Sequence, residues 1–367
     1  MASYLTGKYP WKREAGIEAR QSLAHHLRAA GLRTAAFSEN PYVTPQFGFD
    51  DGFEIFRVYF RPDVLAASPH DYPRIDSART VDDALTWLEG VERERFFLYI
   101  HLLPPHAPYD APAPFARRLD PDYEGTVQGL PKTLVDINKR RVRLEPRDLE
   151  HLRLQYHENL AYADHQVGRM LAEIERRGLM NRTIVVVASD HGEGFYEHGF
   201  LLHNYTLFDE VLHVPLIIRF PSSLGQVPKS WPFPVELRRV FATICDALGV
   251  RSCRRPDESL LIAIRNEPGQ DRPVFAISER ANGTPLKGLV SGKHKLIGTG
   301  DRFEHLILYD LDADSQEKND LAAQRPEVTR VLGEILRRTR LERVTLRDSP
   351  PIPDETRQRL KALGYGD

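Results

Sequence analysis

Three of the chain's 14 histidines, His191, His198 and His203, fall within 13 consecutive residues. The first of them directly follows Asp190, which places an imidazole beside a carboxylate. Imidazole nitrogens and carboxylate oxygens are both common ligands of divalent metals in proteins. This crowding of donor side chains predicts a metal-assisted site.

The residues just before Asp190 indicate where that site lies in the fold. Residues 183–188 (TIVVVA) form a run that is too short for a helix and too apolar for an exposed strand, so we expect a buried parallel strand. The run ends at Ser189, and Asp190 and His191 follow at its carboxyl end. Open α/β sheets gather ligands and chemistry at this edge. We therefore expect both side chains at the edge of a parallel sheet.

Helical and strand-like patterns alternate along the first 250 residues and predict the elements that must position the site. Thr80 is the expected N-cap of one of the helices. Helices are expected at residues 18–30, 80–88, 149–177 and 235–248, and further strands at residues 33–37, 96–100 and 214–220. Short connections between alternating strands and helices predict an α/β fold with a mostly parallel sheet flanked by helices. The polar, proline-rich residues 109–147 are expected to run over an edge of the sheet.

The pattern changes after about residue 251 and predicts a small C-terminal α+β subdomain. A short antiparallel sheet followed by an amphipathic helix at residues 326–341 is expected there. The expected strands are residues 273–278, 287–290, 293–297 and 306–311. The predicted domains are thus a core at residues 1–250 and a subdomain at residues 251–367.

Composition excludes some classes of function. The chain carries 50 basic and 52 acidic side chains, a net charge of −2, which argues against nucleic-acid binding because that requires a clustered basic face. No stretch approaches the roughly 20 apolar residues of a membrane span. Cys245 and Cys253 are too few for a disulfide framework or a zinc site, and the first ten residues lack the apolar core of a signal peptide. Both observations favour a cytoplasmic chain, unless the natural chain begins upstream of Met1 with an export signal.

Several motifs in the expected order resemble the sulfatase family of the alkaline phosphatase superfamily. The central ones are residues 189–193 (SDHGE), residues 197–199 (EHG), and Asp209 with Glu210 ahead of residues 214–218 (VPLII). Further similar stretches are residues 2–10 (ASYLTGKYP), 96–109 (FFLYIHLLPPHAPY), 308–311 (LYDL), 319–322 (NDLA) and 360–365 (LKALGY). The resemblance implies an alkaline-phosphatase-like fold. It also implies a metal-dependent hydrolase of sulfate monoesters that resembles arylsulfatases and acts on a small-molecule or glycan sulfate ester.

The resemblance also implies a role for individual residues. Asp190 and His191 would be ligands of one divalent cation. Sulfatases usually bind calcium, although an imidazole ligand suits manganese or zinc better. His106 would bind the substrate, where an imidazolium could contact a sulfate oxygen or protonate the leaving alkoxide. His203 matches a position where relatives hold Lys or His against the transferred group. His101 and His198 are weaker candidates, with either a supporting or a structural role.

The sequence departs from the family at its beginning. The nucleophile of sulfatases is a formylglycine made from Cys or Ser, and it stands a few residues before the position of Ser3, with acidic metal ligands further upstream. We therefore expect an N-terminally truncated form that lacks the first strand and the nucleophile segment. A phosphodiesterase, phosphonate monoesterase or phosphoryl-group transferase of the same superfamily is the alternative enzyme. The alternative of another class is a non-catalytic relative that binds glycans or a protein.

Overall fold

The computed structural model describes residues 2–9, 17, 19–60, 76–203, 206–225, 227, 230–266, 272–279 and 283–339. The chain forms two compact units, which are described separately below. The motif unit comprises Met1–His26, Arg182–Glu193 and His203–Arg347, and the parallel-sheet unit comprises Leu27–Asn181, Gly194–Leu202 and Asp348–Asp367. The domain boundary that we expected at residue 250 stays a prediction. The motif at residues 360–365 lies outside the described residues.

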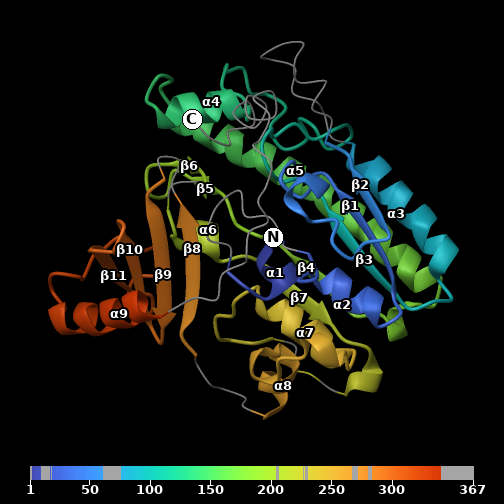
Figure 1. Cartoon of the computed structure of the whole chain (residues 1–367). Helices are drawn as coiled ribbons and strands as arrows, with labels where there is room; N and C mark the ends of the chain where they lie inside the picture. The colour runs from blue at the N-terminus through green and yellow to red at the C-terminus, as the bar shows by residue number, and fades with distance from the viewer. Residues whose placement is uncertain are drawn as a thin grey trace. The chain divides into compact units, whose positions relative to one another are not determined.

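The parallel-sheet unit is built on three parallel strands in the order β2-β1-β3 (Figure 1). These strands are β1 (Arg33–Ser38), β2 (Ile55–Val58) and β3 (Phe96–His101). Helix α3 (Ser77–Val91) packs against β1 and β3, and α5 (Pro146–Arg176) packs beside α3. Their apolar side chains form one core with the strands. The α/β class with a mostly parallel sheet flanked by helices is confirmed. The structure also confirms the expected strand positions of β1 and β3.

The expected N-cap of α3 is wrong. The helix begins at Ser77, and the carboxylate of Asp76 accepts hydrogen bonds from the N–H groups of Ala78 and Arg79. Thr80 is buried in the first turn. Asp and Thr are both good capping residues, so the sequence pattern alone did not separate them.

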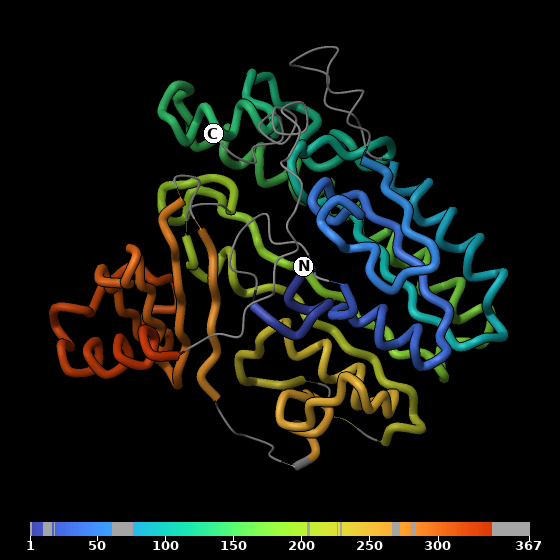
Figure 2. The backbone as a smooth tube through the Cα atoms, viewed as in Figure 1, coloured from blue at the N-terminus to red at the C-terminus, as the bar shows by residue number. Residues whose placement is uncertain are grey.

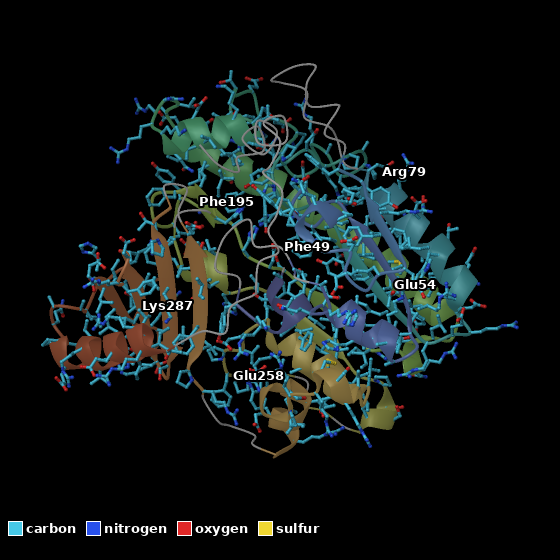
Figure 3. The ribbon with its side chains drawn as sticks, in the orientation of Figure 1. Phe49, Glu54, Arg79, Phe195, Glu258 and Lys287 are labelled. Carbon is cyan, nitrogen blue, oxygen red and sulfur yellow. A yellow bond between two sulfur atoms is a disulfide. The ribbon has the colours of Figure 1, made fainter. Side chains whose placement is uncertain are left out.

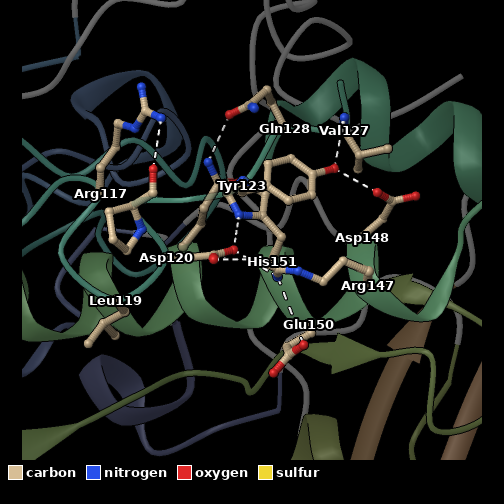
Figure 4. Close-up of polar contacts among 12 residues, drawn as sticks. Arg117, Leu119, Asp120, Tyr123, Val127, Gln128, Arg147, Asp148, Glu150 and His151 are labelled. Carbon is tan, nitrogen blue, oxygen red and sulfur yellow. Dashed lines mark hydrogen bonds and ion pairs between the residues drawn. The ribbon is translucent and has the colours of Figure 1, made fainter. Parts of the chain in front are cut away.

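The long polar segment before α5 is fastened to one face of that helix (Figure 4). Asp120 is hydrogen-bonded to Nδ1 of the buried His151 at 2.6 Å, and the ring of Tyr123 stacks on His151 with centroids 3.5 Å apart. The carboxylate of Glu158 accepts two backbone N–H bonds from the segment, at 2.7 and 2.9 Å. The α5 residues that bond to the segment recur at helical spacing and so lie on one face of the helix. They are residues 148, 151, 155 and 158. The segment contains one helix, α4 (Pro131–Asn138). A short hairpin, β5 (Gly194–Phe195) with β6 (Leu201–Leu202), also belongs to this unit.

The motif unit contains the strand that leads to Asp190, and the prediction of its pairing is wrong. Strand β4 (Val185–Ala188) pairs antiparallel with β7 (Leu216–Arg219), whereas we expected a parallel partner. Its three valines are partly exposed and Ala188 is exposed, so the strand is also less buried than expected. An apolar run indicates a strand, but the path of the intervening chain decides the direction from which a partner arrives. Here the chain returns through α6 (Asp209–Leu212) and enters β7 in the opposite direction.

Several short helices complete this part of the unit. They are α1 (Ala2–Thr6), α2 (Leu23–Ala29, which continues into the parallel-sheet unit), α7 (Arg239–Ala247) and α8 (Leu260–Asn266). Single 3₁₀ turns occur in the chain at Pro45–Phe47, Met180–Arg182, Ser222–Leu224, Arg251–Cys253 and Pro256–Glu258. Cys245 of α7 and Cys253 form a disulfide, with Cα atoms 5.8 Å apart. The two cysteines thus form one local disulfide, which removes the support that we drew from them for a cytoplasmic chain.

The C-terminal part of the motif unit is an antiparallel meander, as predicted (Figure 2). Its strands are β8 (Val274–Glu279), β9 (Pro285–Ser291), β10 (His294–Thr299) and β11 (His305–Asp310). Helix α9 (Pro326–Arg338) packs on this sheet through Leu332 and Leu336. The ammonium of Lys287 on β9, labelled in Figure 3, donates to the carbonyls of Leu336 and Thr339 and so holds the end of α9.

No helix in the described part of the chain is both long and apolar enough to cross a membrane.

Candidate functional site

Asp190 and His191 lie at the carboxyl end of β4, and one contact of the His191 ring indicates the tautomer of the neutral imidazole. Nδ1 of His191 is 2.8 Å from the carbonyl oxygen of Gly192, and Nε2 is 3.7 Å from a carboxylate oxygen of Asp190. A carbonyl can only accept, so Nδ1 carries the hydrogen in the neutral ring and Nε2 carries the lone pair. A carboxylate oxygen of Asp190 lies near this nitrogen, and a cation between the two would be attracted to both.

These donors fit a divalent cation. Two ligands at about 2.0–2.4 Å from one ion lie about 3–4 Å apart, which agrees with the 3.7 Å between Nε2 and the carboxylate oxygen. Metal-bound histidines commonly donate their other N–H to a backbone carbonyl, as His191 does. No group of three or more His, Cys, Asp or Glu side chains gathers as a metal site among the described residues. Asp190 and His191 would therefore supply two of the cation's ligands.

His203 lies against His191 and is held by a carboxylate that we did not predict. Its ring stacks on that of His191 with centroids 3.7 Å apart, and its Nδ1 is 3.1 Å from a carboxylate oxygen of Glu193. The side chains of His203 and Glu193 are 7% and 4% exposed, so this contact is buried. Glu193 belongs to the SDHGE motif, but its spacing from His203 does not indicate a partner. The pair orients His203 so that chemistry at this ring falls to Nε2.

Gly192 brings the backbone of the site into contact with α6. Its N–H donates to the carbonyl of Val211 at 2.8 Å. A Cβ atom at this position would lie 2.1 Å from the carbonyl oxygen of Glu210. No side chain fits there, which explains why the residue after His191 is a glycine.

The parallel-sheet unit carries His101, His106 and His198. His101 ends β3, and its Nδ1 is 3.0 Å from the hydroxyl of Tyr99. His106 is partly exposed in the loop after β3, and its Nδ1 is 2.5 Å from the carbonyl of Ala107. His198 is partly exposed between β5 and β6. The structure thus brings Asp190, His191 and His203 together, and the roles assigned to all six candidates stay predictions.

The loop that carries His106 is anchored by two buried polar side chains. Asn159 of α5 donates to the carbonyl of Pro108 at 2.9 Å. The carboxylate of Glu39, which directly follows β1, accepts the Leu103 N–H at 2.7 Å and the Ser77 hydroxyl at 2.9 Å. Sequence reasoning missed Glu39, whose only signal was its position after a strand end.

Burial of Glu39 makes the folded state sensitive to pH. Its side chain is fully buried, and this desolvation raises its pKa to about 7 despite the Leu103 N–H, which lowers it. The carboxyl ionises near pH 4 when the chain is unfolded, so the contribution of this group to stability is full below about pH 4 and is lost as the pH rises to about 7.

We expect Glu39→Gln to remove this dependence. The amide oxygen of Gln can still accept both hydrogen bonds but carries no charge to desolvate. The variant should match the wild type in pH-independent stability near pH 4 and gain on it by about 3 kcal/mol between pH 4 and pH 8. Urea unfolding at both pH values measures this difference. A variant that is less stable at pH 8 would show that the ionised carboxylate is favourable there.

The comparison with known proteins identifies the family. The Sulfatase family model matches residues 1–250. The chain belongs to the sulfatase family. Within that family, it is 25% identical to arylsulfatase K of Mus musculus over 294 residues, which cover 71% of this chain and 52% of the mouse protein. The chain therefore spans about half the length of this curated relative.

Solved structures show the same fold. Phosphonate monoester hydrolase of Agrobacterium radiobacter matches with a TM-score of 0.69 and 20% identity, over 91% of this chain and 84% of the hydrolase. A protein solved in complex with its substrate D-glucosamine-2-N,6-O-disulfate matches with a TM-score of 0.68 and 18% identity, over 91% of this chain and 86% of that chain. The alkaline-phosphatase-like fold that the motifs implied is thereby confirmed.

Proposed function

We propose that this sulfatase-family chain serves the metal-dependent hydrolysis of sulfate monoesters. The observation that carries the proposal is the 3.7 Å separation between a carboxylate oxygen of Asp190 and Nε2 of His191 at a strand end. Family membership and the likeness to arylsulfatase K support sulfate as the transferred group. The glucosamine disulfate bound by a relative of the same fold supports a glycan or small-molecule sulfate ester as the substrate.

The proposed chemistry assigns one task to each of these side chains and assigns the attacking nucleophile to no residue of this chain. Asp190 and His191 would hold the divalent cation, which would supply positive charge to the oxygens of the ester as negative charge develops on them. The mixed oxygen and nitrogen donors favour manganese or zinc over calcium. Glu193 holds the ring of His203, whose Nε2 contacts an oxygen of the transferred group. The family resemblance assigns substrate binding to His106 in the parallel-sheet unit, where an imidazolium could protonate a leaving alkoxide.

An assay with three ester classes tests the proposal. The protein is isolated from its own cells, stripped of metal with EDTA, and reloaded in turn with Ca²⁺, Mn²⁺ or Zn²⁺. Each form is then given 4-nitrophenyl sulfate, bis(4-nitrophenyl) phosphate and 4-nitrophenyl phenylphosphonate. We expect the highest kcat/KM with the sulfate, no turnover after EDTA, and recovery with Mn²⁺ or Zn²⁺.

Two other results would each replace the proposal. Preference for the phosphonate or the phosphodiester would identify a phosphoryl hydrolase of the same superfamily. Cation binding without turnover of any ester, including a sulfated glucosamine, together with a natural chain that begins at Met1, would identify a non-catalytic glycan- or protein-binding relative. The exposed His157→Gln variant on α5 serves as the matched control for handling and metal loading.

A further inference from the structure

A lysine of the C-terminal meander is completely buried between two carboxylates. The side chain of Lys295 on β10 is 0% exposed. Its ammonium is 2.7 Å from a carboxylate oxygen of Asp209 and 2.8 Å from one of Glu317, whose side chain is 1% exposed. A buried ammonium is stable only with such partners. The three residues are called the lysine cluster below. Removal of one of them would leave a buried charge without its partner and destabilise the folded state.

The lysine cluster holds Asp209, the first residue of α6, through an ion pair and a backbone hydrogen bond. Asp209 is bound through its side chain by Lys295, and its backbone N–H donates to the second carboxylate oxygen of Glu317 at 2.7 Å. Glu317 is held at a φ of +54°, a conformation that costs a non-glycine residue free energy. Leu207, just before α6, packs into the same sheet with Leu286 and Ile297. The C-terminal sheet thus fixes where α6 begins.

The other end of α6 fixes the backbone of the candidate site. The carbonyl of Val211 accepts the Gly192 N–H, and the carbonyl of Glu210 occupies the space where a side chain at Gly192 would lie. Gly192 in turn supplies the carbonyl that bonds Nδ1 of His191. A shift of α6 must therefore move Gly192, and with it the separation between His191 and Asp190.

We propose that Lys295 is a positioning residue, which acts through Asp209 and α6 to hold Asp190 and His191 at a separation that binds a divalent cation. The proposal rests on the proposed function, because it assigns a role to a remote residue of the same site. The C-terminal sheet would then influence the affinity for the cation, although it supplies none of the assigned ligands.

The test compares two variants of the full chain. Lys295→Met with Glu317→Gln removes both buried charges together, while the Gln oxygen can still accept the Asp209 N–H. Lys293→Met is the matched control, because Lys293 lies just before β10 and pairs at 2.7 Å with the buried Asp310, not with α6. Mn²⁺ affinity is measured by the EPR signal of the free ion. Hydrogen exchange of the peptide that contains Gly192 is measured without metal.

We expect the double variant to melt cooperatively, to bind Mn²⁺ at least about tenfold more weakly, and to exchange the Gly192 amide faster. Lys293→Met should match the wild type in both readouts. Unchanged Mn²⁺ affinity and unchanged exchange in a folded double variant would overturn the positioning role. Should the double variant not fold, Glu317→Gln alone gives the same comparison, with smaller changes expected in the same direction.

The two proposals fail in different ways. A wild-type chain that binds no divalent cation would overturn the proposed function. The exchange measurement needs no metal, so it still reports whether Lys295 holds Gly192 in place.

Discussion

Asp190→Asn is expected to abolish most of the stability that a divalent cation gives to this chain. A cation at about 100 times its Kd stabilises the folded state by about 2.7 kcal/mol. The amide keeps the shape of the side chain but loses the negative charge that lies 3.7 Å from Nε2 of His191. Loss of an outer partner alone weakens metal sites about 10–100-fold, so loss of a direct ligand should cost at least about 100-fold. The stabilisation at the same Mn²⁺ concentration then falls to about 0.4 kcal/mol or less.

Urea unfolding with and without Mn²⁺ measures this effect, and His191→Gln should reproduce it. Asp312→Asn is the matched control, because Asp312 is an exposed carboxylate on the turn after β11. The same loss in the control would indicate unspecific binding to surface charge. Wild-type Mn²⁺ affinity in both Asp190→Asn and His191→Gln would show that the cation, if any, binds elsewhere.

Gly192→Ala is expected to destabilise the folded state by about 2–4 kcal/mol. The added methyl group would lie 2.1 Å from the carbonyl oxygen of Glu210, which is backbone and cannot rotate away. Either α6 or the loop that carries Asp190 and His191 must move, so Mn²⁺ affinity should fall as well. The free energy of unfolding from urea titration measures the first effect, and the Mn²⁺ EPR signal measures the second.

The same substitution at Gly168 should have the opposite sign. Gly168 is exposed in the middle of α5, and a Cβ atom there meets nothing within 4 Å. Alanine is the better helix former, so Gly168→Ala should stabilise the chain by about 0.5–1 kcal/mol. A Gly192→Ala variant as stable as the wild type would show that α6 yields easily, which would also weaken the case for Lys295 as a positioning residue.

The parts of this protein that the sequence determined by itself are those set by local pattern. The spacing of apolar residues placed α5, the meander and α9 close to their observed bounds, because each buries one face of its own periodic segment. Asp190 and His191 were placed at a strand end correctly because a strand and its ending lie within a few consecutive residues. Motif resemblance added the family and its fold, which the comparison confirmed.

Only the tertiary structure decided which remote groups meet. It set the antiparallel pairing of β4 with β7 and joined Cys245 to Cys253. It placed Glu193 on His203, and it buried Lys295 between Asp209 and Glu317. The physical reason is the same in each case. A side chain's own neighbours in sequence determine its local conformation, but its charge, burial and bonding partners depend on which distant segment packs against it.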